Sequence, residues 1–218
     1  MNIKRIMAFG CSITYGEGLI DCLDSNNMRP PYPSEYAWPA CLGKTFDCPV
    51  QNLGHPGTSN KNICNQILQQ RYKKDDVAII LWTDFARTTF YTDETRWIDI
   101  QPSSTLLQKP WKRKIAKSFY KTLYFDINQN IESYSAINFA KLYLDEKGVK
   151  NYHFIWAELP FNNTKAPDWN KVNIRYINLY QDHNPNYIFI DYASDDLHPG
   201  IKTQNLIADT MSNIILND

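Results

Sequence analysis

Short apolar segments alternate with longer amphipathic segments along this 218-residue chain, and this alternation is the strongest constraint on its fold. The clearest apolar segment, 77–82, reads Val-Ala-Ile-Ile-Leu-Trp and contains no charged residue. A continuous apolar run of this length is typical of a strand buried on both faces of a parallel sheet. Because helices connect such strands and cover both faces, the pattern predicts an α/β protein.

Five apolar segments are predicted to be strands, and five amphipathic segments are predicted to be helices. The expected strands are 3–9, 48–53, 77–82, 152–157 and 187–190. The expected helices are 34–45, 60–71, 131–147, 169–180 and 203–216. The helix at 131–147 should end at Gly148, since glycine readily adopts the left-handed conformation that terminates many helices.

One stretch, 85–130, does not fit this alternation, although residues 1–218 have a length expected of a single domain. It is too long for a simple connection, is rich in aromatic side chains, and carries a basic cluster at 109–117. We interpret it as an insertion that packs its own aromatic side chains beneath a solvated basic face. The alternative is a lid over the active site, where aromatic side chains contact substrate and cationic ones meet an anionic group.

Composition and charge exclude several classes of function. The 23 basic and 23 acidic side chains cancel, which removes a global electrostatic argument for binding nucleic acid or an anionic membrane. The five cysteines form no C-x-x-C pair, so we expect neither a zinc knuckle nor a redox motif. No metal and no cofactor are expected. No apolar run reaches the roughly 18 residues of a membrane span, and the N-terminus lacks a signal-peptide pattern. These features predict a cytoplasmic protein with reduced thiols.

A candidate nucleophile follows the first predicted strand directly, in the segment Gly10-Cys11-Ser12-Ile13-Thr14. Open α/β sheets bind ligands beyond the carboxyl ends of their strands, so Ser12 should lie at the mouth of a site. The alternative is that Ser12 only caps a following helix, since serine is a favoured N-cap. Cys11 is the weaker nucleophile candidate, because no histidine lies near it in sequence and a small buried thiol is the commoner role.

A candidate base lies near the other end of the chain. Asp195 and His198 are three residues apart, a spacing at which a carboxylate can orient an imidazole. A histidine held in this way can take the proton of a serine hydroxyl and return it to a leaving group. Pro199 should hold His198 at a loop-to-helix junction. The alternative is a surface histidine, with Asp196 as a charge at the start of a helix.

Together these segments resemble the conserved blocks of the SGNH (GDSL-type) hydrolase superfamily. Residues 10–14 resemble block I, with cysteine where aspartate is common; residues 52–60 resemble block II; and residues 195–198 resemble block V. The resemblance implies a three-layer α/β/α sandwich with a flavodoxin-like five-stranded parallel sheet. It also implies a catalytic triad and two backbone N–H donors to an oxyanion. The triad would be Ser12, His198 and Asp195, and the donors would be Ser12 and Gly54.

The third block departs from the family pattern. The family usually has G-x-N-D after the third strand, where the asparagine is a further oxyanion donor, but this chain has Trp82-Thr83-Asp84-Phe85. A Thr83 hydroxyl can donate a hydrogen bond and an ionised Asp84 cannot, while Asn60 is the other possible replacement. Losing one donor typically costs about 10²–10³ in rate, so a slow or inactive protein is the remaining option. Arg87 is expected either to pair with Asp84 or to bind an anionic substrate group, and both residues are candidate substrate contacts.

The function expected from these residues is that of a serine hydrolase of the esterase or acetylesterase type. It would cleave a small acyl ester or an O-acetylated sugar through an acyl-enzyme. The expected partner is therefore a small-molecule or glycan ester, and neither nucleic acid nor a membrane. The alternative is a catalytically weak or inactive binding module of the same fold for a carbohydrate or other small ligand. A phosphate-binding nucleotide enzyme is disfavoured, because the glycine turns lack the expected lysine and the G-x-G-x-x-G register.

Overall fold

The centre of the molecule is a five-stranded parallel sheet with the strand order β2-β1-β3-β6-β7. The computed structural model describes residues 3–22, 32–93, 96–107, 109–156, 173–177 and 189–218. The strands are β1 (Arg5–Gly10), β2 (Val50–Gly54), β3 (Asp76–Trp82), β6 (Lys150–Ile155) and β7 (Ile174–Tyr176). This order is that of a flavodoxin-like sheet, so the predicted fold class is confirmed.

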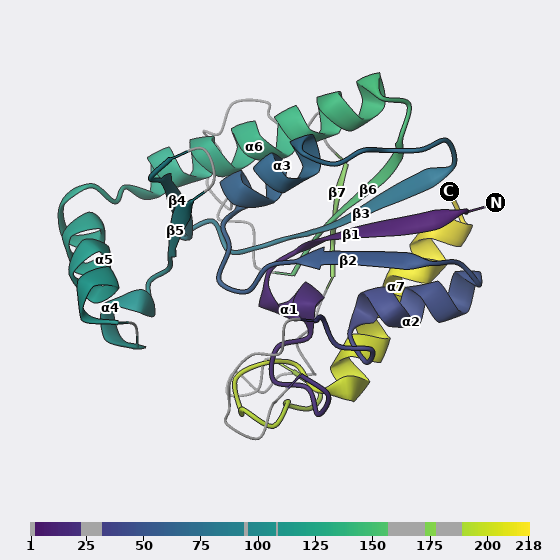
Figure 1. The fold of residues 1–218 in the computed structure, drawn as a ribbon, viewed down its shortest axis with the longest axis horizontal. Coiled ribbons are helices and arrows are strands. Elements are labelled where there is room, and N and C mark those ends of the chain that lie inside the picture. The colour runs from purple at the N-terminus through teal and green to yellow at the C-terminus, as the bar shows by residue number, and fades with distance from the viewer. Residues whose placement is uncertain (1–2, 23–31, 94–95, 108, 157–172, 178–188) are drawn as a thin grey trace.

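Alternate side chains of β1 enter two separate cores, because successive residues of a strand point to opposite faces of the sheet. Ile6 and Ala8 pack on the side of α2 (Trp38–Phe46) and α7 (Ile201–Leu216). Met7 and Phe9 pack on the side of α3 (Asn60–Leu68) and α6 (Asp126–Glu146). Figure 1 shows the resulting three layers, with α2 and α7 on one face of the sheet and α3 and α6 on the other.

The end of α6 follows the prediction in detail. Gly148 has a φ of +65°, and its N–H donates to the Asp145 carbonyl at 2.9 Å. The N–H of Val149 donates to the Leu144 carbonyl at 2.9 Å. These two bonds form a Schellman motif, in which glycine in the left-handed conformation ends the helix. The predicted helices 34–45, 60–71, 131–147 and 203–216 correspond to α2, α3, α6 and α7, with ends that differ by a few residues.

Two predicted elements near the end of the sheet are wrong where the structure describes them. The expected helix 169–180 is contradicted at Ile174–Tyr176, which forms β7; apart from residues 173–177, this range lies outside the described residues. The expected strand 187–190 lies half outside them, and its described half, Phe189 and Ile190, is a bend. The backbone of β7 is held by pairing with β6, which is distant in sequence and leaves no local pattern.

The aromatic and basic segment forms a small unit beside the sheet. The hairpin of β4 (Thr88–Tyr91) and β5 (Trp97–Ile100) is followed by α4 (Ser104–Leu107) and α5 (Pro110–Thr122). Phe119 of α5 is buried against Ile100 and packs edge-to-face with Phe90 and Tyr120. The segment therefore packs its own aromatic side chains, and its role as an insertion or a lid stays a prediction.

All five cysteine thiols are free, and Cys11, Cys22 and Cys64 are buried. Burial raises the pKa of the Cys64 thiol to about 11, which makes it a poor nucleophile at neutral pH. Within the described part of the chain, no helix combines the length and the apolar character needed to cross a bilayer.

Candidate active site

Ser12 lies at the carboxyl edge of the sheet, where the sequence predicted it. β1 ends at Gly10, which pairs with Gly54 of β2 and with Leu81 of β3. Ser12 then begins the four-residue helix α1 (Ser12–Tyr15). Position 10 requires glycine, because a β-carbon there would lie 2.1 Å from Thr14 Oγ1 and 2.8 Å from the Leu81 carbonyl oxygen.

The structure supports neither alternative for this turn. Cys11 is the N-cap residue of α1 and Ser12 is the first helical residue, so the Ser12 hydroxyl does not cap the helix. Cys11 is fully buried and packs in the core cluster that contains Ile13 and Trp38. Ser12 lines the cavity at the sheet edge and Cys11 does not.

Asp195 and His198 form the contact that their spacing predicted. His198 Nδ1 lies 2.6 Å from Asp195 Oδ2, and Asp195 Oδ1 accepts the N–H groups of Leu197 and His198, both at 3.0 Å. Burial favours a higher pKa for the Asp195 carboxyl, but these hydrogen bonds outweigh it and lower that pKa below its ordinary value. An ionised Asp195 accepts a proton donor at Nδ1, which leaves Nε2 of a neutral ring as the base.

The loop that carries this pair is fixed to the turn after α1. The N–H of Ala193 donates to the His198 carbonyl at 2.8 Å, which closes the loop on itself. The N–H of Ser194 donates to the Gly18 carbonyl at 3.0 Å. Gly18 has a φ of +83°, and a β-carbon there would lie 2.5–2.7 Å from the Asp195 carboxylate. Glycine at this position therefore lets the two loops touch.

Ser12 and His198 line a single cavity of about 550 Å³. Among the described residues, no hydrogen bond joins the Ser12 hydroxyl to the His198 ring. His198 Nε2 lies instead 3.5 Å from Glu17 Oε2, and Glu17 lines the same cavity. Catalytic hydrogen bonds are often long in ligand-free proteins and shorten when substrate binds. The candidate nucleophile and the candidate base therefore line the same cavity.

The predicted oxyanion donor Gly54 requires a correction. Its N–H already donates to Asn52 Oδ1 at 2.9 Å, and Asn52 Nδ2 donates to the Thr14 carbonyl at 2.7 Å. Gly54 is not among the residues that line the cavity, whereas Gly57 is. Gly57 has a φ of +79°, and nothing lies within 4 Å of a β-carbon built there. Of these two glycines, only Gly57 therefore lies at the cavity.

The two candidates for the missing asparagine amide also lie outside the cavity lining. Asn60 Nδ2 donates to the Thr83 carbonyl at 3.0 Å and to Ser133 Oγ at 3.3 Å, and Asn60 Oδ1 accepts the Thr83 N–H at 2.8 Å. Asn60 is 1% exposed, so its amide joins α3 to the end of β3. Thr83 is fully buried, and its hydroxyl finds no hydrogen-bond partner among the described residues.

Asp84 and Arg87 occupy different places. Asp84 Oδ1 accepts the Ala86 N–H at 2.8 Å, and Asp84 does not line the cavity. Arg87 does line it, and its Nη1 is buried without a hydrogen bond to any described residue. No ion pair joins Asp84 to Arg87 in the described part of the chain, so the expected structural pairing is not found.

Trp82, which stands where the family's third block has glycine, is a fully buried core residue. Its Nε1–H donates to His153 Nδ1 at 3.0 Å, and the two rings stack with their planes 16° apart. His153 Nε2 lies 2.9 Å from Asn151 Oδ1. The tryptophan thus completes a buried polar contact between β3 and β6, and it does not enter the cavity.

Most of the remaining cavity lining comes from the segment after β3 and was not singled out residue by residue from the sequence. These residues are His55, Pro56, Trp97, Ile98, Asp99, Gln101, Lys109, Trp111 and Lys112. Only the aromatic and basic composition of 85–130 pointed to those after β3, whereas His55 and Pro56 fall within the segment 52–60 that resembles block II. Asp99 is 8% exposed; burial raises the pKa of its carboxyl, although the Thr89 hydroxyl and Trp97 Nε1–H both donate to it.

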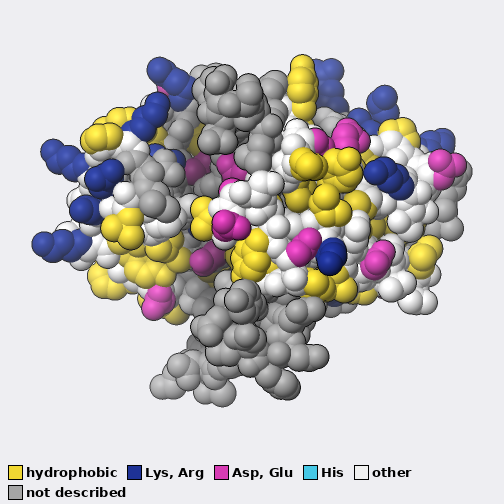
Figure 2. All heavy atoms as spheres, turned by 90° about the horizontal axis from the view of Figure 1, so that it is seen from below, with side chains coloured by type: hydrophobic (Ala, Val, Ile, Leu, Met, Phe, Trp, Pro, Cys, Tyr) yellow, Lys and Arg dark blue, Asp and Glu magenta, His cyan; other side chains and the backbone are white. Residues whose placement is uncertain are grey.

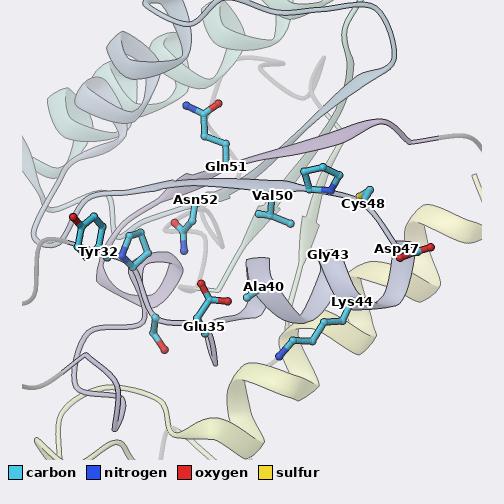
Figure 3. Close-up of a pocket in the computed structure, with 13 residues that line it drawn as sticks. Tyr32, Glu35, Ala40, Gly43, Lys44, Asp47, Cys48, Val50, Gln51 and Asn52 are labelled. Atoms are coloured by element: carbon cyan, nitrogen blue, oxygen red, sulfur yellow. The ribbon is translucent and has the colours of Figure 1, made fainter.

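A larger cavity, of about 840 Å³, lies between β2 and α2 (Figure 3). Glu35, Lys44, Asp47 and Gln51 are among the side chains around it, and neither Ser12 nor His198 lines it. Among the described residues that line it, no serine or cysteine is paired with a histidine, so the smaller cavity is the candidate site. Within the described residues, no three His, Cys, Asp or Glu side chains gather closely enough to hold a metal ion.

Comparison with known proteins gives structural matches only. No family model and no curated protein matches the sequence. A protein assigned to the G-D-S-L family of lipolytic proteins, from Desulfitobacterium hafniense DCB-2, matches with a TM-score of 0.53 at 12% identity, over 97% of this chain and 99% of that one. The esterase EstA from Pseudoalteromonas sp. matches with a TM-score of 0.50 at 13% identity, over 99% and 100%.

An acetyl xylan esterase from the rumen bacterium Butyrivibrio proteoclasticus matches with a TM-score of 0.52 at 13% identity. All of this chain is covered, but only 64% of that longer protein. At these identities the matches establish the fold. With the strand order and the three layers, they show that this chain has the α/β/α fold of the SGNH (GDSL-type) hydrolases.

Proposed function

We propose that this protein is a serine hydrolase that cleaves the acyl ester of a small molecule or a sugar. The observation that carries the proposal is the 2.6 Å contact between Asp195 and His198, made by a histidine that shares a cavity with Ser12. A carboxylate at Nδ1 leaves Nε2 to face a reacting group. The folds that resemble this chain include an esterase and an acetyl xylan esterase, which supports ester chemistry at this edge of the sheet.

In the proposed reaction, Ser12 Oγ attacks the acyl carbon of the ester while His198 Nε2 takes its proton. Asp195 stabilises the imidazolium that forms. The tetrahedral intermediate collapses as His198 returns the proton to the departing alcohol, leaving an acyl group on Ser12. Water then attacks the acyl-enzyme by the same proton route and releases the acid. Each step balances without a cofactor.

The developing oxyanion would be stabilised by the backbone N–H groups of Ser12 and Gly57. We assign Gly57 this role in place of Gly54, because Gly57 lines the cavity and the Gly54 N–H is held by Asn52. Because glycine has no side chain, its N–H can approach a substrate oxygen closely. Neither the Asn60 amide nor the Thr83 hydroxyl lies at the cavity, so the donor that the family's third block supplies is not replaced by either residue, and we expect modest turnover.

A fluorophosphonate probe tests the proposal directly. Such a probe requires an activated serine, so we expect stoichiometric labelling of the wild-type protein, with the adduct located on Ser12 by peptide mass spectrometry. The Ser12→Ala variant should not be labelled, and His198→Ala should be labelled far more slowly. An unlabelled wild-type protein with an intact fold would favour the binding-module alternative.

The contact between Gly18 and the Asp195 loop gives a second prediction. A β-carbon in Gly18→Ala would push the Asp195 carboxylate away, and a displacement of about 1 Å can cost roughly 10²-fold in kcat/KM. Alanine at a positive φ should also lower the free energy of unfolding by about 1–2 kcal/mol. Gly148→Ala is the matched control, because Gly148 has a φ of +65° and no atom near its would-be β-carbon. Equal ester hydrolysis by the two variants would refute the positional role of Gly18.

A further inference from the structure

Three cationic side chains line the cavity that holds Ser12 and His198. Arg87 comes from the turn between β3 and β4, and Lys109 and Lys112 come from the start of α5. Figure 2 shows dark blue Lys and Arg side chains gathered at the end of the molecule where α5 lies. No acidic residue lies in the first turn of α5, so its N-terminus adds to the positive potential of this wall.

Arg87 is the best placed of the three. Its Nη1 is buried and has no hydrogen-bond partner among the described residues. A buried guanidinium donor without a partner costs free energy that a bound anion would recover. The Tyr120 hydroxyl donates to the Ala86 carbonyl at 2.7 Å, so α5 is fixed directly against the turn that presents Arg87. The cationic wall is thus built on packed elements.

The two carboxylates of the cavity already have partners of their own. Asp99 accepts the hydroxyl of Thr89 and the Nε1–H of Trp97. Glu17 Oε2 lies 3.5 Å from His198 Nε2. Neither carboxylate forms an ion pair with Arg87 within the described residues, so neither of them neutralises its guanidinium.

Two tryptophan rings accompany the cations. Trp97 and Trp111 line the cavity and are 38% and 53% exposed, so each presents part of a flat apolar surface to a ligand. Indole rings at a site lined mostly by polar side chains suit a ligand that combines a ring with charged or polar groups. The wall therefore offers both a stacking surface and cationic donors.

We infer that the substrate is an ester that carries an anionic group, a carboxylate or a phosphate, and that Arg87 binds this group, assisted by Lys109 and Lys112. This inference rests on the proposed function, because it names the class of ester that reaches Ser12. It assigns Arg87 and the start of α5 to substrate selection. The anionic group would lie on the α5 side of the cavity, away from the carboxylate of Glu17.

The test compares three acetate esters of phenols: 4-acetoxybenzoate, 4-acetoxyphenyl phosphate, and the neutral methyl 4-acetoxybenzoate. The variant-to-wild-type ratio of kcat/KM for each ester removes differences in leaving-group reactivity. For Arg87→Gln, we expect the preference for an anionic ester over the neutral one to fall roughly 10- to 100-fold. The anionic ester whose kcat/KM falls more in Arg87→Gln identifies its own group, carboxylate or phosphate, as the one that is recognised.

Lys114→Gln is the matched control, because Lys114 lies on α5, is exposed, and does not line the cavity. Its ester preference should equal that of the wild type. Arg87→Lys should retain part of the preference, since lysine keeps the charge and loses the two-pronged geometry. The wild-type preference should also weaken in about 1 M salt, because screening then acts within about 3 Å.

Binding gives a readout that does not depend on catalysis. Calorimetry of 4-hydroxybenzoate with Ser12→Ala and with Ser12→Ala/Arg87→Gln should show affinity that is roughly 10-fold lower when Arg87 is lost. Equal affinity, or an Arg87→Gln effect of the same size on anionic and neutral esters, would overturn the inference and leave the proposed function intact. If no ester is cleaved and Ser12 is not labelled, the proposed function fails, and the calorimetry alone decides the anion site.

Discussion

Ser12→Ala is expected to lower kcat for short-chain 4-nitrophenyl esters by roughly 10⁴- to 10⁶-fold, the size of loss seen when a nucleophile that acts together with a base is removed. The loss should be this large because His198 can only activate a hydroxyl that is present, and none of the other groups placed at the cavity replaces it. Activity is measured by release of nitrophenolate at neutral pH. The thermal unfolding midpoint should change little, because the Ser12 side chain caps no helix.

Two controls separate chemistry from folding. Ser118→Ala removes an exposed hydroxyl on α5 and should leave hydrolysis unchanged. Cys11→Ala removes the thiol next to Ser12, and hydrolysis should persist because Cys11 is fully buried and does not line the cavity. Hydrolysis by Ser12→Ala at the wild-type rate would rule out Ser12 as the nucleophile. If Cys11→Ala lost activity with an intact fold, the Cys11 thiol would become the candidate nucleophile.

The parts of the fold that the sequence predicts well are those with a strong local pattern. The apolar run of β3 is buried along its whole length, and the turn after β1 carries Ser12 at the expected edge. Asp195 and His198 are in contact because they are only three positions apart on one loop. By contrast, β7 is three residues long and is recognised only through its pairing with β6, which no local pattern records.

The site is less predictable than the fold, because sequence spacing does not show which polar groups are already hydrogen-bonded to other parts of the protein. Gly54 matched the expected position, yet its N–H is held by the Asn52 side chain two residues earlier. Asn60 has the side-chain amide that an oxyanion donor needs, yet this amide is already hydrogen-bonded to the backbone of Thr83. Arg87 was read first as a partner of Asp84, and its place on the cavity wall depends on how β4 and α5 pack. Such competition is visible only in three dimensions.

His153 carries the second large expectation, a loss of stability in mild acid. Burial lowers the pKa of its ring to about 3, and nearby Lys141 lowers it further while Asp145 opposes the shift. The hydrogen bonds around the ring explain why the neutral form is required. Asn151 Nδ2 donates to Asp145 and to the Val149 carbonyl, so its Oδ1 accepts from His153 Nε2–H. Nδ1 must then accept the Trp82 Nε1–H. A proton added at Nδ1 would point at this N–H, so the hydrogen bond would be lost.

The sign of the effect follows from the two pKa values. In the unfolded chain His153 takes up a proton as the pH falls through about 6.5, whereas in the folded protein it stays neutral until about pH 3. Between these values the unfolded state binds more protons, so the free energy of unfolding falls by up to about 1.4 kcal/mol per pH unit. Over the whole interval the loss is roughly 5 kcal/mol, a large share of a typical domain's stability.

Urea unfolding at a series of pH values between 6.5 and 4.5 measures this loss, and Asp195 stays ionised across this window because the pKa of its carboxyl is lowered. The wild type should lose about 2–3 kcal/mol across this window. His153→Gln keeps a hydrogen-bond acceptor and a donor but no group that titrates. Its free energy of unfolding should therefore lack this pH dependence, and at pH 6.5 it should be lower than that of the wild type. His55→Gln should keep the wild-type slope, because His55 is not buried in the core. If His153→Gln retained the full slope, the acid sensitivity would arise elsewhere, and the ring of His153 would have to accept a proton in the folded core.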